Sequence, residues 1–151
     1  MLSALVNFND NHLFIKMADT IDKKKRSWNM GQIKGSNTKP EKIVRSYLHK
    51  SGLRFRLHDK SLPGKPDIIL KKHNAVVFVD GCFWHRHKGC KYSYEPKTRR
   101  KFWKTKFDNN VKRDRDVNKA YQNIPWNIIR IWECELNEKR LEKLVKRIKS
   151  S

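Results

Sequence analysis

The stretch that decides the fold is residues 66–80, which read Pro-Asp-Ile-Ile-Leu-Lys-Lys-His-Asn-Ala-Val-Val-Phe-Val-Asp. Two apolar runs, 68–70 and 75–79, flank a polar turn at 71–74. Short apolar runs rich in β-branched residues and separated by a tight turn are typical of an antiparallel hairpin. The stretch therefore predicts two paired strands, with Asp67 just before the first and Asp80 just after the second.

The register of this hairpin would bring two carboxylates together. Pairing Leu70 with Ala75 places Asp67 opposite Phe78, with Asp80 one diagonal step away. Alternate residues of a strand share a face of the sheet, and diagonal neighbours are within reach of one another. We therefore expect Asp67 and Asp80 on one face, where a single ion could contact both.

Helical patterns lie on both sides of the hairpin. Residues 38–41 form a capping box with proline in the first turn, apolar residues follow at helical spacing, and Gly52 ends the segment. Residues 98–122 are helical in pattern, 126–132 form an apolar strand, and Asn137 caps a last amphipathic helix. This order predicts an α/β fold, a mixed sheet with helices on its faces.

The charge balance points to a polyanionic partner. The 151 residues contain 36 Lys and Arg against 15 Asp and Glu, a formal net charge of +21. This excess is self-repulsive in the folded protein and is typical of nucleic-acid binding. A surface-charged protein without chemistry remains the alternative on charge alone. No apolar run is long enough for a transmembrane helix, and the three cysteines favour thiolate–metal bonding in a reducing compartment over a disulfide framework.

The cysteines are candidate ligands for zinc. Cys82 and Cys90 flank His87 in a Cys-x4-His-x2-Cys pattern, and Cys134 follows a predicted strand that can return to the same place. A structural zinc takes four thiolate and imidazole ligands in a tetrahedron. His85 is a second candidate for the imidazole ligand, although His87 is nearer Cys90. The alternative is three unrelated buried thiols, since free cysteine packs as a small hydrophobe.

The carboxylates are candidate ligands for magnesium, which prefers oxygen atoms and keeps several waters. Such an ion at Asp67 and Asp80 could activate a water and neutralise a scissile phosphate. His85 could act beside it as a general acid or base. Glu41 is a third candidate carboxylate, and its alternative role is the capping box. For Asp67 the alternative is the ordinary frequency of Asp after a turn.

Five aromatic residues stand among cations, namely Trp28, Phe83, Trp84, Phe102 and Trp103. Aromatic side chains can wedge between base pairs or stack on unpaired bases. The alternative is core packing, which we expect for Phe102. Metal-ligand candidates flank Phe83 and Trp84, which favours a functional surface for these two.

Several segments, taken together, match the motifs of one enzyme family. The most specific is Gly-Cys-Phe-Trp-His at 81–85 with Trp-Glu-Cys at 132–134, and the others are 62–67, Asn110 with Arg113 and Asp114, 26–30 and 37–41. By these motifs the chain resembles the very short patch repair (Vsr) DNA mismatch endonucleases, from about Met17 to about Leu144. The resemblance implies a restriction-endonuclease-like fold, a mixed central sheet flanked by helices, with one structural zinc.

The resemblance also implies an activity. It implies magnesium-dependent nicking of one strand of duplex DNA, on the 5′ side of the thymine in a T:G mismatch that arises from deaminated 5-methylcytosine. Asp67 and the backbone carbonyl of Val79 would hold the magnesium, His85 would act next to the attacked phosphate, and Glu41 would orient a metal-bound water. Asp80 stands where the best-characterised member has histidine, and here it could ligate the metal directly.

The remaining implied roles concern zinc and the bases. The implied zinc ligands are Cys82, His87, Cys90 and Cys134, although Lys88 and Gly89 lengthen the loop before Cys90. The implied wedge beside the mismatch is formed by Phe83, Trp84 and Trp103.

The chain divides into three expected parts. Residues 1–16 are expected to be an extension, residues 17–37 a basic arm or helix that contacts DNA, and residues 38–151 the endonuclease domain. The implied protein is a monomer of the bacterial cytoplasm that acts at the nucleoid on mismatched duplex DNA. Its partners would be mismatch-repair proteins and a cytosine methyltransferase, and no membrane is involved. The competing hypotheses are a restriction-type or other modified-DNA nuclease and a zinc-stabilised DNA-binding module without catalysis.

Overall fold

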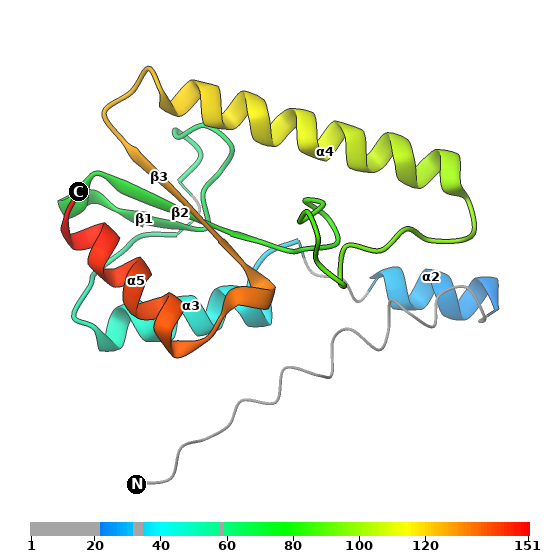
Figure 1. Ribbon diagram of the computed structural model, residues 1–151, viewed down its shortest axis with the longest axis horizontal. Coiled ribbons are helices and arrows are strands. Elements are labelled where there is room, and N and C mark those ends of the chain that lie inside the picture. Colours follow the sequence, from blue (N-terminus) through cyan, green and yellow to red (C-terminus); the bar gives the residue numbers. More distant parts are fainter. Residues whose placement is uncertain (1–21, 32–34, 58) are drawn as a thin grey trace, which may run out of the picture.

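The central feature of the protein is a three-stranded mixed sheet (Figure 1). The computed structural model describes residues 22–31, 35–57 and 59–151. The strands are β1 (Ile68–Leu70), β2 (Ala75–Asp80) and β3 (Asn127–Trp132), in the spatial order β1-β2-β3. β1 runs antiparallel to β2, and β3 runs parallel to β2. Leu70 pairs with Ala75, so the predicted hairpin and its register are confirmed.

The helices lie on both faces of this sheet, as the sequence predicted. Helix α4 covers one face and carries the chain from β2 to the parallel strand β3, while α3 and α5 lie against the other face (Figure 1). The α-helices are α2 (Lys23–Gly31), α3 (Lys39–Lys50), α4 (Arg100–Tyr121) and α5 (Glu138–Lys149). Two short 3₁₀ turns, Lys71–His73 and Glu133–Glu135, complete the described elements.

The caps of α3 and α5 follow the predicted chemistry. The side chain of Thr38 accepts a hydrogen bond from the Glu41 amide, and the Glu41 side chain accepts from the Thr38 amide, so the capping box is present. Gly52 has φ of +80° just after α3, a conformation that glycine adopts without penalty. Asn137 caps α5 by accepting from the Arg140 amide. These local signals set the ends of both helices.

Strand alternation divides the core into two clusters. One strand face packs against α3 and α5, and its buried residues include Ile68, Leu70, Val77, Ile129 and Ile131. The other face packs against α4, where Ile69, Val76 and Phe78 of the strands contact Val117 and Tyr121 of the helix. Since side chains two apart share a face, Asp80 and Arg130 lie on the α4 side with Phe78.

The turn that leads into β1 is fitted closely against α4. Gly64 has φ of +74°, and a Cβ there would lie 2.7 Å from both methyl carbons of Val117. The hydroxyl of Tyr121 donates to the Pro63 carbonyl over 3.0 Å. Only glycine combines this backbone conformation with so close an approach. The Pro-Gly turn therefore positions Asp67 relative to α4.

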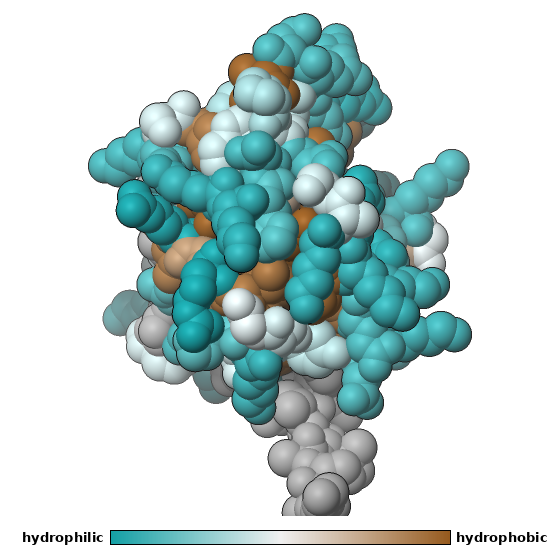
Figure 2. Space-filling view, turned by 90° about the vertical axis from the view of Figure 1, so that its left-hand side faces the viewer, coloured by the Kyte–Doolittle hydropathy of each residue, from teal (hydrophilic) through white to brown (hydrophobic). Residues whose placement is uncertain are grey.

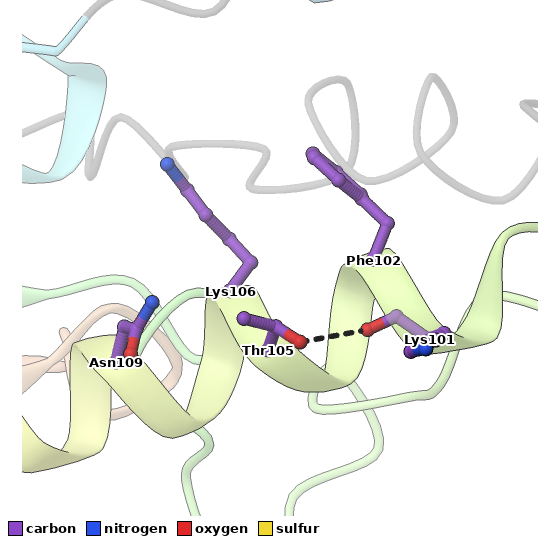
Figure 3. A pocket seen from close by; sticks show the side chains of 5 residues that line it. All are labelled: Lys101, Phe102, Thr105, Lys106 and Asn109. Carbon is purple, nitrogen blue, oxygen red and sulfur yellow. Dashed lines mark hydrogen bonds between the residues drawn. The ribbon is translucent and has the colours of Figure 1, made fainter.

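The position of Phe102 differs from the expectation that it packs in the core. It is 48% exposed on α4 rather than packed in the core, because the part of α4 that carries it extends beyond the sheet (Figure 1). It lines a hollow of about 450 Å³ with Lys101, Thr105, Lys106 and Asn109 (Figure 3). Its side chain and that of Lys106 point away from the helix in the same direction, and the Arg99 guanidinium lies 4.5 Å from its ring centroid.

The surface reflects the composition. Figure 2 shows a face dominated by long hydrophilic side chains, with hydrophobic residues visible between them. Every helix among the described residues is too short or too polar to cross a bilayer. Helix α2 falls within the predicted basic arm, and its Trp28 is 59% exposed. The expected extension at residues 1–16 lies outside the described residues, and the division into three parts stays a prediction.

Candidate active site and metal centre

Two groups of polar side chains meet where β2 and β3 end. Asp80 and Trp132, the last residues of these strands, are register partners. The loop after β2 carries cysteines, histidines and aromatics, and the segment after β3 carries Glu133 and Cys134. In α/β sheets the carboxyl ends of parallel strands are the usual place for ligand chemistry. Parallel pairing therefore brings residues about fifty positions apart into one site.

The first group is a candidate metal centre. Cys82, His87, Cys90 and Cys134 place one ligand atom each within 4.8 Å of one another. Nδ1 of His87 lies 3.5 Å from Sγ of Cys82 and 3.3 Å from Sγ of Cys134. Ligands about 2.0–2.3 Å from a tetrahedral zinc would be separated by similar distances. The four predicted ligands therefore come together, and His87 rather than His85 supplies the imidazole of this group.

The metal centre is supported by its own surroundings. The His87 ring stacks on Trp132 with centroids 4.1 Å apart and an angle of 3° between the planes. The Cys82 amide donates to Oε1 of Glu133 over 2.8 Å. Burial raises the pKa of the Cys82 thiol and, to a lesser extent, that of Cys134. A bound divalent cation reverses this preference because it stabilises thiolates, so the donor set fits zinc.

The second group begins with Asp67, just before β1. Its Oδ2 accepts a hydrogen bond from the Val79 amide over 2.8 Å. Burial raises the pKa of Asp67 to about 6, assisted by the charges of Glu41 and Asp80 and opposed by the Val79 hydrogen bond and Arg45. A half-buried carboxylate that is costly to ionise is stabilised by a cation. Asp67 is therefore suited to hold a divalent ion.

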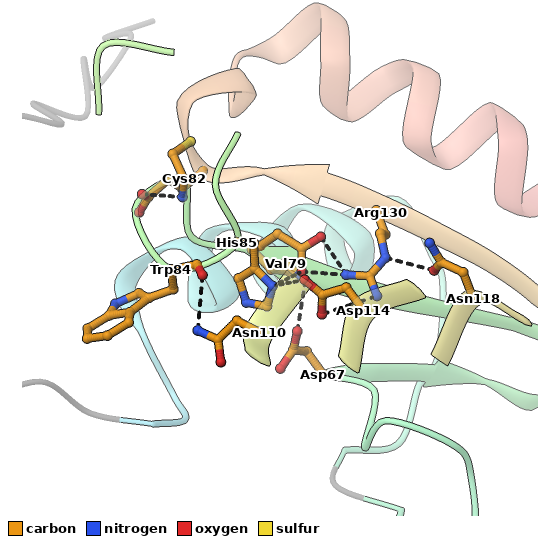
Figure 4. A network of polar contacts seen from close by, with 11 residues as sticks. Asp67, Val79, Cys82, Trp84, His85, Asn110, Asp114, Asn118 and Arg130 are labelled. Atoms are coloured by element: carbon orange, nitrogen blue, oxygen red, sulfur yellow. Dashed lines mark hydrogen bonds and ion pairs between the residues drawn. The ribbon is translucent and has the colours of Figure 1, made fainter. Parts of the chain in front are cut away.

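His85 is held by Asp114, a residue of α4 that lies outside the β1–β2 hairpin. Its Nδ1 lies 2.6 Å from Oδ2 of Asp114, which comes from α4 (Figure 4). Burial opposes ionisation of Asp114, but the hydrogen bond to His85 and the charges of His85, Arg130 and Arg113 outweigh it, so the pKa of Asp114 is lowered. An ionised carboxylate only accepts hydrogen bonds. Nδ1 therefore carries the proton, which leaves Nε2 unprotonated in the neutral imidazole.

Asp80 is buried and engaged. Its carboxylate is 4% exposed, and both oxygens accept from Nη1 of Arg130, at 2.9 and 2.8 Å. Oδ1 also lies 3.8 Å from Nδ1 of His85. Asp67 and Asp80 are close enough for the charge of Asp80 to raise the pKa of Asp67. A direct magnesium bond to Asp80 would have to share oxygens with the arginine, and this role stays a prediction.

Glu41 is also fully engaged. Oε1 accepts from the amide and hydroxyl of Thr38, and Oε2 accepts from the Asn37 amide and from Nη2 of Arg45, at 2.6 Å. The side chain therefore serves as the capping-box residue of α3, which was its alternative role. Its charge still reaches Asp67, so it contributes to the electrostatics of the carboxylate site. Orientation of a metal-bound water by Glu41 stays a prediction.

The aromatic residues form a cluster beside His85. Phe83 is 4% exposed and contacts Trp84, Trp103 and Phe107, with ring centroids 5.0–5.4 Å apart. Trp84 and Trp103 are half-buried around it. Nδ2 of Asn110 donates to the Trp84 carbonyl over 3.0 Å. In this structure Phe83 is the centre of the cluster, and Trp84 and Trp103 form its rim.

Three residues of the site, Asn110, Asp114 and Arg130, were given no role from local sequence pattern. Asp114 and Asn110 appeared only within the family motifs, with no role, and Arg130 did not appear at all. Asp114 and Asn110 come from α4 and reach the loop after β2, whereas Arg130 comes from β3 and reaches Asp80 at the end of β2. The one available signal was an arginine inside an otherwise apolar strand, at 128–131. A half-buried charge in an apolar strand is expected to have a partner, and buried Asp80 is that partner.

The fold and these two groups define an α/β protein with a candidate Cys/His metal centre beside a carboxylate–histidine site. A family model described as DNA mismatch endonuclease Vsr matches residues 18–91. The type II nicking enzyme V.XorIIP of Xanthomonas oryzae is 43% identical over 81% of this chain and 89% of its own. The type II nicking enzyme V.NmeAIP of Neisseria meningitidis is 41% identical over 89% and 99%.

A third relative carries the family name. The DNA mismatch endonuclease Vsr of Escherichia coli is 43% identical over 80% of this chain and 76% of its own. The chain therefore belongs to the Vsr family of DNA endonucleases, as its motifs indicated. Like other members, it is a nuclease that hydrolyses DNA.

Proposed function

We propose that this endonuclease nicks one strand of duplex DNA on the 5′ side of the thymine in a T:G mismatch. The observation that carries the proposal is the placement of Asp67 and the His85–Asp114 pair at the end of the sheet where β2 and β3 terminate, beside the aromatic cluster. Asp67 and His85 would contact the phosphodiester, and the adjacent aromatic cluster would contact the unstacked base pair. The family, and the names of its relatives, support a nicking reaction.

Asp67 and the Val79 carbonyl are the residues proposed to hold magnesium. Oδ2 of Asp67 is occupied by the Val79 amide, while Oδ1 has no hydrogen-bond partner among the described residues. Bound magnesium would supply Lewis-acid activation of water and charge neutralisation at the phosphate. The proposed roles of Asp80 and Glu41 as further acidic residues are indirect, because other groups occupy their oxygens.

His85 is proposed to act at the scissile phosphate. Asp114 fixes Nδ1, and Nε2 is free of hydrogen bonds among the described residues. Nε2 can then accept a proton from a nucleophile or, once protonated, donate one to a phosphate oxygen or leaving group. The carboxylate keeps the imidazole in one tautomer and one orientation throughout.

The aromatic rim is proposed to recognise the mismatch. Trp84 and Trp103 stand at the edge of the cluster around Phe83, and Lys and Arg side chains extend along α4. Inserting aromatic side chains unstacks base steps, which costs less at a mismatched pair. Exposed Phe102 and Lys106 would extend this surface along the DNA backbone. Zinc at the Cys/His centre would hold the loop that carries Phe83 and Trp84.

The decisive experiment is strand-resolved cleavage of end-labelled duplexes that differ only in one base pair. We expect the T:G duplex to be nicked in the thymine strand, only with magnesium, while matched and other mismatched duplexes stay intact. Asp67→Asn, purified in parallel, controls for contaminating nucleases. Equal cutting of matched DNA would instead identify a restriction-type nuclease. DNA binding without any cleavage would identify a binding module.

A further inference from the structure

The guanidinium of Arg130 lies between Asp80 and Asp114, the two carboxylates that face Nδ1 of His85. Arg130 comes from β3, and its side chain is 19% exposed on the face that α4 covers. Nη1 donates to both oxygens of Asp80, and Nη2 lies 3.7 Å from Oδ1 of Asp114 (Figure 4). The proposed reaction gives this arginine no role of its own.

The guanidinium is fixed from several directions. Its Nε donates to Oδ1 of Asn118 over 3.1 Å, and its Cζ lies 4.8 Å from the centroid of the Phe78 ring. Asn118 and Asp114 are one turn apart on α4, so they share a face of that helix. A planar guanidinium can satisfy all of these partners at once, whereas an ammonium cannot. Arg130 therefore ties α4 to both β2 and β3 at the level of Asp114.

The contacts of Arg130 with Asp80 and Asp114 affect how His85 is oriented. Nδ1 of His85 has two carboxylates within reach, Oδ2 of Asp114 at 2.6 Å and Oδ1 of Asp80 at 3.8 Å. Asp80 already accepts two hydrogen bonds from Arg130, which weakens it as an acceptor for the imidazole. Asp114 faces Arg130 only at the longer distance of 3.7 Å, so its other oxygen is available to His85.

We propose that Arg130 is a positioning residue that selects which carboxylate holds His85. By engaging Asp80 and anchoring α4, it keeps the imidazole on Asp114 and so determines where Nε2 points. The effect on nicking rests on the proposed function of His85, whereas the effect on the imidazole does not. Asp80 is then the partner of Arg130 rather than a free metal ligand.

The first test reads the histidine directly, in protein without magnesium. The ¹⁵N resonances of the His85 ring, assigned with His85→Gln, are followed on substituting either carboxylate. In the unmodified protein, Asp114→Asn should shift the Nδ1 resonance strongly and Asp80→Asn weakly. In an Arg130→Lys background this order should reverse. The same order in both backgrounds would overturn the proposal.

The second test uses turnover. Arg130→Lys keeps the charge but loses the fork, and we expect kcat for nicking to fall about 10- to 100-fold while KM changes by less than about twofold. Arg140→Lys is the matched control, because Arg140 pairs with Glu135 away from His85, and it should leave kcat unchanged. A raised KM with unchanged kcat would make Arg130 a DNA contact and overturn the proposal.

Two further variants separate the possible failures. If Arg130 acts through Asp114, Arg130→Lys should cost little further activity once Asp114→Asn is present, and fully multiplicative losses would contradict this. If Arg130→Lys does not fold, Arg130→Gln, which leaves both carboxylates in place, replaces it in both tests. Should the unmodified protein nick no duplex, the proposed function fails, while the ¹⁵N experiment still decides the role of Arg130.

Discussion

The metal centre and the carboxylate–histidine site lie side by side but are assembled differently. Three of the four residues of the Cys/His group come from one nine-residue loop, 82–90. The carboxylate–histidine site draws Asp67 from the turn just before β1, His85 from that loop, Asp114 from α4 and Arg130 from β3. One site is thus mostly local in sequence, and the other exists only when the helix and all three strands are packed together.

The difference teaches what each site depends on. Burial raises the pKa of the Cys82 thiol, so a bound metal would be expected to stabilise the Cys/His group by stabilising its thiolates. The carboxylate–histidine site needs correct packing of α4 on the sheet. Perturbing the metal should therefore affect the whole protein, and perturbing the packing should affect chemistry first.

The largest effect is expected at Cys134, the one distant member of the Cys/His group. Cys134→Ala should abolish stoichiometric zinc and lower the free energy of unfolding by at least about 5 kcal/mol, since metal binding contributes folding energy directly. Elemental analysis and urea unfolding measure both effects. His49→Ala, outside the group, should change neither. Unfolding curves that coincide with and without a chelator would contradict a structural metal.

Asp114→Asn should have the next largest effect, confined to chemistry. An amide in place of the carboxylate no longer enforces the Nδ1 proton of His85, so kcat for nicking should fall about 10²- to 10⁴-fold, with zinc content unchanged. Asp116→Asn, exposed on the same helix, is the matched control. Comparable losses for both variants would show that general charge on α4, and not the pair with His85, is responsible.

Gly64→Ala tests the packing on which the carboxylate–histidine site rests. The new Cβ would meet Val117 at 2.7 Å in a left-handed backbone conformation, which should cost about 2–3 kcal/mol of stability. Gly52→Ala has a similar positive φ with nothing within 4 Å and should cost about 1 kcal/mol. Thermal unfolding of both variants measures the difference. Equal losses would mean that backbone strain alone matters and that α4 does not constrain the turn.

The smallest expected effect is a gain in stability at Asp67. Its folded pKa of about 6 exceeds the ordinary value of 3.8, so the folded state binds more protons between these values and loses stability as the pH rises through them. Asp67→Asn removes this penalty. Without magnesium, it should be about as stable as the unmodified protein near pH 4 and about 2 kcal/mol more stable above pH 6.

Urea unfolding across this pH range, with zinc retained, measures the gain at Asp67. The opposite slope, a gain that fades as the pH rises, would show that Asp67 is stabilised rather than strained as an anion. The same variant should be inactive in nicking. Stability and activity would then oppose each other at the carboxylate–histidine site, whereas at the Cys/His group they should be lost together.

Local patterns predicted the elements well because their determinants are local. The capping box at Thr38 and Glu41, the cap at Asn137 and the pairing of Leu70 with Ala75 all follow from neighbouring residues. The expectation that Phe102 packs in the core was wrong, because its exposure depends on how far α4 extends beyond the sheet. Local pattern assigned no role to Asp114 or Arg130, because their partners lie 29 and 50 residues away.

The sequence by itself determined the mixed α/β sheet, the local Cys82–Cys90 part of the Cys/His group and, through its motifs, membership of the Vsr family. Short-range spacing and strand alternation are sufficient for these, because they depend on residues that stay close in any folded arrangement. Only the tertiary structure decided that His85 pairs with Asp114 and that Asp80 is held by Arg130. The physical reason is that a buried charge takes whichever partner the packing of distant elements brings within hydrogen-bond distance.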